Sequence, residues 1–300
     1  MDESRASKSI LITAWVTILA ITLWNIILQE IFQYKVSENT YYLVSGTIVV
    51  LGLILTFIWK AIRPLRPFYG LFIVLLAAQW LVFVPLGEVP AVKGWLNHPS
   101  FNVNMVVEVL LKLLVTLAVI AYLLLLKKTR QEFFLAKGDL AAPVEPVRWL
   151  GVAPGTRWNR FGLILAVCLS LGTLAFLIIA GRPPLDIVVK ALPFLPAVLF
   201  AAAMNSFNEE MTYKASFLSI LEDVVGKPHA LGLLAAFFGI LHFYGIPYGV
   251  IGVLLAAFLG WVLGKSMLET RGLFWAWFLH FLQDVWIFAF LAIGSITPGG

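Results

Sequence analysis

The chain has 300 residues, of which 61% are hydrophobic and only 12% are charged. Soluble domains carry about 25% charged residues, so this composition indicates a membrane protein and excludes an ordinary soluble enzyme. The net charge of +5 is modest, and inner loops of membrane proteins collect Lys and Arg in any case, so we expect no nucleic-acid partner. The single cysteine, Cys168, excludes an intrachain disulfide and a thiolate metal cluster.

Nine apolar runs follow one another along the chain. Because a bilayer core of about 30 Å takes roughly 20 apolar residues per helix, we predict an all-α fold, a polytopic membrane helix bundle of about nine transmembrane helices. The first run follows Arg5 and Lys8 and is too long for a signal-peptide core, so we interpret it as a spanning helix. A turn signal at 245–249 separates the seventh run from the eighth. The runs are 9–29, 41–60, 68–86, 103–126, 161–180, 187–208, 229–247, 248–268 and 272–294.

Basic residues concentrate in alternate loops between these runs. They precede the first run, follow the second, fill the segment after the fourth and lie between the eighth and the ninth. By the positive-inside rule, this pattern places the N-terminus in the cytoplasm and the C-terminus outside. We divide the chain into N-terminal transmembrane helices (1–128), a cytoplasmic or interfacial linker (129–160) and C-terminal transmembrane helices (161–300).

Ionisable side chains inside a span need a physical reason, because a charge at a helix centre costs about 2.5–3.5 kcal/mol. Most of those in this chain follow residue 205. An earlier pair, Glu108 and Lys112, lies in the fourth run with a spacing of four residues, so we expect the two to form an ion pair. The alternative for this pair is a part in substrate binding.

Two adjacent glutamates, Glu209 and Glu210, interrupt the sixth apolar run. Adjacent residues of a helix point about 100° apart, so the two carboxylates need not share a role. Glu210 shares a helix face with Lys214 and can pair with it, which leaves Glu209 without a local partner. An unpaired carboxylate in apolar surroundings is a candidate general base. The alternative is a solvated helix end at a loop.

Two further polar positions follow on later runs. His242 ends the sequence Phe238-Gly-Ile-Leu-His in an apolar stretch, and His280 precedes Asp284 by four residues in the last run. Residues four apart share a helix face, so His280 and Asp284 can act on one atom or on each other. The alternatives are a packed histidine at 242 and a structural ion pair in the last helix. Side chains from three helices that meet inside a bundle are the usual way to build a polar site in a membrane.

The three motifs resemble a known family. Glu-Glu followed after three residues by a basic residue, Phe and three residues later His, and His and three residues later Asp or Asn occur here in that order on successive runs. This pattern is similar to the CPBP family, which joins type II CAAX prenyl endopeptidases with bacteriocin-processing and immunity proteins. The resemblance covers about residues 187–294 and implies an integral protein of a bacterial inner (plasma) membrane.

The resemblance also implies roles for the matching residues. Glu209 would activate the attacking water and His242 would hold or polarise it, while His280 and Asp284 would stabilise the oxyanion or bind the substrate carbonyl. The family usually has Arg at the position of Lys214, Gly at that of Ala215 and often Asn at that of Asp284. An ionised Asp284 cannot donate to an oxyanion, so it would be protonated or would orient His280. The supporting positions are Glu210, Lys214 and Phe238.

The implied function is an intramembrane endopeptidase, a hydrolase that cleaves a membrane-associated protein or peptide, prenylated or bearing a C-terminal signal. It would work in the lipid bilayer with no cofactor, or as a metalloprotease with a divalent metal such as zinc held by Glu209, His242 and His280. Two histidines and a glutamate are an adequate zinc set, although no His-Glu-x-x-His helix is present. The alternatives are a catalytically inactive binding or immunity protein of the same type and a membrane transporter.

The depth of these residues in the membrane depends on where the sixth helix begins. If it begins at 187, Glu209 lies at its inner end, while His242 and His280 lie deeper. A start near 194 that continues through 217–221 brings the three closer, and Pro193 and Pro196 favour it, because proline suits a first helical turn.

Overall fold

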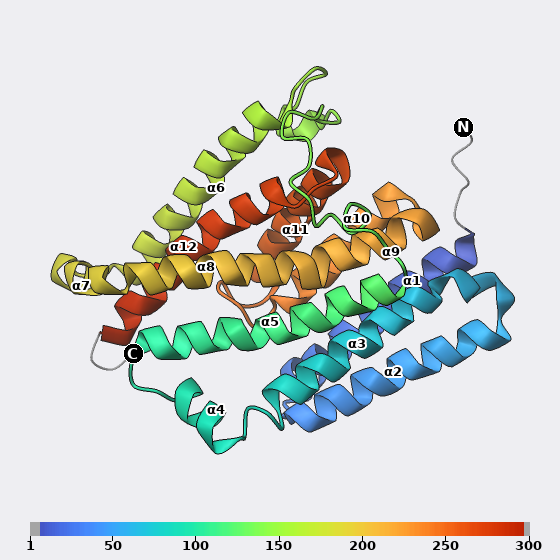
Figure 1. Ribbon diagram of the computed structural model, residues 1–300, viewed down its shortest axis with the longest axis horizontal. Helices are drawn as coiled ribbons and strands as arrows, with labels where there is room; N and C mark the ends of the chain where they lie inside the picture. Colours follow the sequence, from blue (N-terminus) through green and yellow to red (C-terminus); the bar gives the residue numbers. More distant parts are fainter. Residues whose placement is uncertain (1–6, 297–300) are drawn as a thin grey trace.

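The computed structural model describes residues 7–296, and throughout that range the regular elements are helices (Figure 1). This arrangement confirms the prediction of an all-α polytopic bundle. The long helices are α1 (Lys8–Ile26), α2 (Glu38–Ile58), α3 (Arg66–Phe83), α5 (Phe101–Leu125), α6 (Trp158–Gly181), α8 (Leu195–Glu209), α9 (Ser216–Val225), α10 (Lys227–Leu241), α11 (Val250–Thr270) and α12 (Phe274–Ile296). The short ones are α4 (Pro90–Leu96) and α7 (Leu185–Ala191), the 3-10 turns η2 (Lys60–Leu65), η3 (Arg148–Leu150) and η4 (Leu192–Phe194), and the π-helical turns η1 (Ile27–Ile31) and η5 (Glu210–Ala215).

Eight helical segments of the described chain are long and apolar enough to cross a membrane. The predicted seventh run, 229–247, is the exception, because its helix α10 has only 15 residues and is about 22 Å long. It ends at His242, where backbone hydrogen bonds from Gly245 to His242 (2.9 Å) and from Gly249 to Phe243 (2.7 Å) close a turn. The predicted seventh span is therefore the shorter apolar helix α10, which ends in a loop, and His242 is the residue that directly follows it.

The sixth span begins later than the predicted start at 187. Its first residues form the separate short helix α7 and the turn η4, and α8 begins at Leu195, which confirms the alternative start near 194. The helix then continues through η5 into α9 and reaches Val225. Glu209 is thus about 21 Å from the start of α8, in mid-helix, so the alternative of a solvated helix end is wrong.

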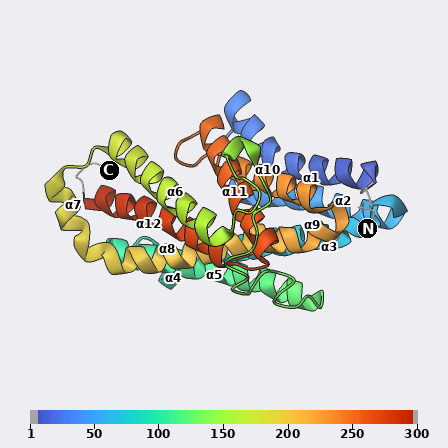
Figure 2. The ribbon, with the colours of Figure 1, turned by 90° about the horizontal axis from the view of Figure 1, so that it is seen from above.

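The N-terminal and C-terminal helices share one core. Figures 1 and 2 show α5 running alongside α8, α12 against α8 and α6, and α1 to α3 on the side of the molecule away from α6. Between the two groups, the Phe72 ring of α3 makes edge-to-face contacts with Phe217 (5.1 Å) and Phe237 (5.4 Å). Such aromatic pairs contribute about 0.5–1.5 kcal/mol each beyond their burial, so they hold α3 against α9 and α10.

The basic loops meet at one end of the molecule. Lys128, after α5, lies 3.8 Å from Asp223 at the end of α9, and Arg271, after α11, lies 2.7 Å from Glu222. Loops that alternate along the chain must lie on one side of a membrane if each intervening pair of helices crosses it twice, and these contacts agree with that requirement.

The segment 129–160 packs over the turn between α11 and α12. Asp139 donates its backbone N–H to Thr270 O (2.8 Å), and Leu273 donates to Ala136 O (2.8 Å). Phe133 and Phe134, which belong to this segment, have fully buried rings. These bonds tie the segment to the C-terminal helices along a fixed path.

Replacement of Gly138 by alanine should loosen this attachment. Gly138 has φ +78°, and a Cβ there would lie 2.6 Å from Thr270 O. We expect the substitution to cost about 1–3 kcal/mol from the left-handed backbone, with the clash in addition. Gly151 is the matched control, because it has φ +70° and open space around its Cβ position. Limited proteolysis within 129–160 should accelerate much more in Gly138→Ala than in Gly151→Ala, and equal rates would contradict the role of the close contact.

Candidate active site

The boundary between α8 and the π-helical turn η5 falls between the two glutamates of the Glu-Glu motif. Glu209 is the last residue of α8, and its side chain, 19% exposed, lines a cavity. Glu210 is the first residue of η5, and its side chain is fully buried on another face. Single π turns within α-helices occur often at functional sites, because the wider turn re-aims the side chains around it. The expectation that the two carboxylates point apart is confirmed.

Glu210 is the centre of a buried ion cluster. Its Oε1 accepts from Lys214 Nζ (2.7 Å), which confirms the predicted pair, and from His280 Nδ1 (2.7 Å). The Lys214 ammonium also lies 3.4 Å above the centre of the Phe238 ring. Glu210 Oε2 is buried without a hydrogen-bond partner. An arginine could reach both carboxylate oxygens, whereas a lysine makes one point contact, so this orphan oxygen is consistent with the lysine at position 214.

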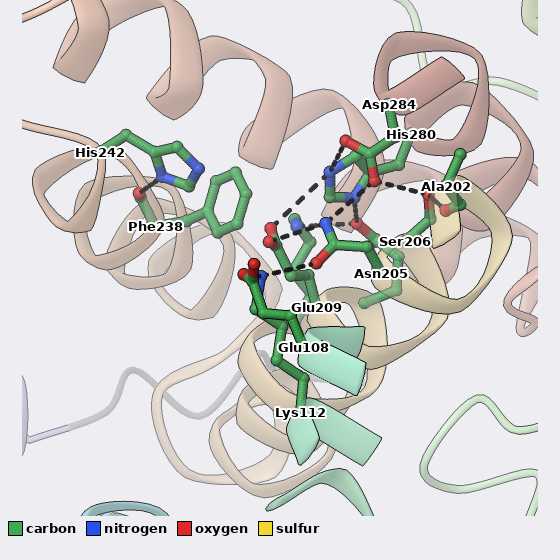
Figure 3. A network of polar contacts seen from close by, with 12 residues as sticks. Glu108, Lys112, Ala202, Asn205, Ser206, Glu209, Phe238, His242, His280 and Asp284 are labelled. Atoms are coloured by element: carbon green, nitrogen blue, oxygen red, sulfur yellow. Dashed lines mark hydrogen bonds and ion pairs between the residues drawn. The ribbon is translucent and has the colours of Figure 1, made fainter. Parts of the chain in front are cut away.

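Glu209, His280 and Asp284 converge from α8 and α12 (Figure 3). His280 Nε2 lies 3.7 Å from Glu209 Oε2 and 3.6 Å from Asp284 Oδ1. Since Nδ1 of the same ring faces the Glu210 carboxylate, a proton on Nε2 points to the place where the other two carboxylates meet. With Nδ1 donating to Glu210, a proton on Nε2 as well makes the ring a cation, so His280 can present a positively charged donor beside Glu209.

Two residues to which the sequence interpretation gave no role complete this arrangement. Asn205 Nδ2 donates to Glu209 Oε1 (3.1 Å) and to Asp284 Oδ2 (3.0 Å), and Ser206 Oγ also lies 3.0 Å from Asp284 Oδ2. The expectation that Glu209 lacks a local partner is wrong, because Asn205 lies one helical turn earlier on the same face. That spacing was the signal available in the sequence.

His242 faces the same cavity from the end of α10. Its Nδ1 lies 2.7 Å from Phe238 O. A carbonyl oxygen only accepts, so Nδ1 carries the proton and Nε2 keeps its lone pair. In Figure 3 the Phe238 ring lies between His242 and His280, and it packs against both imidazoles at centroid distances of 4.4 and 6.3 Å.

The loop after His242 is tied to η1. Tyr248 is hydrogen-bonded to Glu30, and this contact raises the pKa of Tyr248 to about 12. Tyr244 also lies near Glu30, and burial raises its pKa from the ordinary value. The loop therefore has an anchor outside the helices that carry the polar cluster.

The cavity beside Glu209 has a volume of about 340 Å³, and His242 lies in its wall. A second cavity of about 80 Å³ adjoins the other side of Glu209 and shares Lys112, Gln79 and Tyr213 with the first. Most of the first wall is apolar or aromatic, and much of it comes from α1, α2 and α3 through Ile21, Thr22, Tyr41, Tyr42, Ser45, Phe72, Leu75, Leu76 and Gln79.

Glu209, His242 and His280, the metal ligands considered from the sequence, are not placed to bind one ion. In the part of the chain that the structure describes, no three His, Cys, Asp or Glu side chains are placed to hold one ion. The reason is local, since the Phe238 ring stands between the imidazoles of His242 and His280. No step of the chemistry proposed below uses a metal.

The comparisons with known proteins concern the C-terminal third of the chain. Residues 191–286 match the model of the family described as Type II CAAX prenyl endopeptidase Rce1-like. No curated protein and no solved structure matches the chain. The matched segment contains Glu209, His242, His280 and Asp284, and it leaves α1 to α6 outside. Residues 191–286 are thus similar to the Rce1-like type II CAAX prenyl endopeptidases, the family that the order and spacing of the three motifs predicted.

Proposed function

We propose that the chain is an intramembrane endopeptidase that hydrolyses a peptide bond of a membrane-associated protein with Glu209 as the general base. The observation that carries the proposal is the position of the Glu209 carboxylate, which lies 3.7 Å from His280 Nε2 and lines the 340 Å³ cavity. A carboxylate beside a donor and open to a cavity is the arrangement that general-base hydrolysis needs.

The reaction begins with a water in the cavity between Glu209 and His242. The Nε2 lone pair of His242 accepts one hydrogen bond from the water, and Glu209 takes the other proton as the oxygen attacks the carbonyl carbon. Negative charge develops on the former carbonyl oxygen, and a proton on His280 Nε2 stabilises it. The C–N bond then breaks, and Glu209 returns its proton to the leaving amine.

Asp284 acts on its neighbours rather than on the substrate. It accepts hydrogen bonds from Asn205 and Ser206 at one oxygen, and its other oxygen lies 3.6 Å from His280 Nε2. The Asn205 amide nitrogen can only donate, so the Asp284 oxygen that faces it accepts. Of the two alternatives for Asp284, we therefore adopt the one in which it orients His280.

The substrate is a protein held at the membrane by an apolar or lipid-modified segment. Eight helices that are long and apolar enough to cross a membrane support a site within a bilayer. The cavity wall is mainly aromatic and aliphatic, so an apolar segment fits it best. The basic end of the molecule faces the cytoplasm in this proposal, with the N-terminus on that side. The C-terminus lies outside if α10 and the loop after it together make a ninth crossing.

Mass spectrometry of membrane proteins tests the proposal. We compare cells that express the wild-type chain, cells that express Glu209→Gln and cells without the chain. A shortened membrane protein that appears only with the wild type supports the proposal. Identical protein masses in all three samples contradict it and leave the binding protein or the transporter.

A larger side chain in the cavity should weaken substrate binding. Leu76 of α3 lines the cavity, so Leu76→Trp places an indole where the substrate lies. We expect KM to rise roughly tenfold or more while kcat changes little, because the polar cluster is untouched. Leu81→Trp is the control, since Leu81 lies on the same helix, is 53% exposed and does not line the cavity. Equal KM values for the two variants would show that substrate does not occupy this space.

A further inference from the structure

We infer that Lys112 of α5 is a positioning residue of the active site, because it fixes the orientation of the Asn205 amide that holds Glu209 and Asp284 in place. Lys112 lies outside the family segment 191–286. The inference rests on the proposed function of Glu209 and adds a part that α5 contributes to it.

The hydrogen bonds of Asn205 run in one direction. Lys112 Nζ donates to Asn205 Oδ1 (3.0 Å), and Asn205 Nδ2 donates to Glu209 Oε1 and Asp284 Oδ2. An ammonium group has only donors, so the amide oxygen must face Lys112. Both N–H groups of the amide are then directed at the two carboxylates, as Figure 3 shows.

The opposite orientation of the amide would disrupt the cluster. With Asn205 reversed, its oxygen would face Glu209 and Asp284, and both carboxyl groups would lose the hydrogen bond from Asn205. The carboxyl groups of Glu209 and Asp284 lie on either side of His280 Nε2, at 3.7 and 3.6 Å, and the Asn205 amide donors bridge them. Lys112 selects the orientation that keeps the general base beside His280.

The Lys112 ammonium is stabilised by an ion pair with Glu108 and by a cavity that can hold water. Glu108 Oε1 lies 3.0 Å from Lys112 Nζ, as predicted from the sequence, and the two side chains are 42% and 32% exposed. Lys112 lies about 17 Å from the start of α5 at Phe101 and lines the 80 Å³ cavity. A cavity of this size has room for water, which lowers the cost of the charge at this depth.

The packing of α5 against the site does not depend on Lys112. Asn208 Nδ2 donates to Val109 O (2.9 Å), and Thr116 Oγ1 lies 3.0 Å from both Asn208 Oδ1 and Thr212 Oγ1. These buried bonds join α5 to α8 and η5 on either side of Lys112. A variant at position 112 should therefore keep the fold while it loses the orientation of Asn205.

Two variants of the same ion pair separate positioning from stability. Lys112→Met removes the donor to Asn205 and keeps the chain length, whereas Glu108→Gln leaves that donor in place. We expect kcat of Lys112→Met to fall roughly 10- to 100-fold with KM within about threefold, because a misplaced base slows the chemical step. Glu108→Gln should lower kcat by much less than Lys112→Met does, because it keeps the donor to Asn205. Lys112→Arg should recover part of the rate, since a guanidinium also donates.

The outcome that overturns the inference is equal kcat for Lys112→Met and Glu108→Gln, or a loss in both that follows the fall in melting temperature. A cryo-EM structure of Lys112→Met decides the question without turnover. The inference requires that Asn205 no longer bridges Glu209 and Asp284 in that variant, and an unchanged Asn205 refutes it. Absence of any Glu209-dependent cleavage by the wild type would instead refute the proposed function.

Discussion

The Glu209→Gln variant is expected to bind its substrate normally and to lose peptide-bond cleavage. Glutamine keeps the shape of the side chain and can still accept from Asn205, but it cannot take a proton from water. General-base catalysis contributes about 10²- to 10⁴-fold, so we expect kcat to fall by that factor while KM stays close to the wild-type value. The measurement is steady-state cleavage of the substrate that mass spectrometry identifies, with purified protein in lipid.

Glu108→Gln is the matched control for Glu209→Gln. It also removes one carboxylate within a span, but Glu108 pairs with Lys112 and does not reach the cavity wall. Retained cleavage in Glu209→Gln would exclude this residue as the base. In a binding protein, both variants should behave like the wild type.

The second large effect is expected on stability, from Lys214→Met. Lys214 and Glu210 are both 0% exposed and lie 2.7 Å apart. Removal of one partner of a buried pair leaves an uncompensated charge, which costs about 3–5 kcal/mol. Only His280 Nδ1 would still donate to Glu210, whose Oε2 already lacks a partner. The free energy of unfolding in mixed detergent micelles measures the effect.

A surface pair of similar geometry is the control for Lys214→Met. Lys93 and Glu88 lie 2.6 Å apart with side chains that are 55% and 70% exposed, so Lys93→Met should cost only about 0–1 kcal/mol. The double variant Glu210→Gln with Lys214→Met should recover part of the lost stability, because no unpaired charge then remains buried. A loss no larger than that of Lys93→Met would contradict the stabilising role of this buried pair.

The hydrophobic pattern of the sequence was sufficient to predict the helices, and residue spacing was sufficient to identify the motifs. Runs of about 20 apolar residues have the length of a membrane-spanning helix, and a helix satisfies all of its backbone groups within the run. The spacing of four residues fixed three pairs in advance, Glu108 with Lys112, Glu210 with Lys214 and His280 with Asp284, because such residues share a helix face whatever lies around them. The resemblance of residues 191–286 to their family also followed from the order and spacing of the motifs on apolar runs.

Tertiary structure alone decided which atoms meet. Local spacing could not show that His280 Nδ1 reaches Glu210 while Nε2 faces Glu209, because the two helices are 70 residues apart in the chain. It also could not show that Phe238 separates the imidazoles, or that Lys112 of α5 orients Asn205. Periodicity within a helix determines the face of each side chain, whereas the contacts of that face depend on how the whole bundle packs.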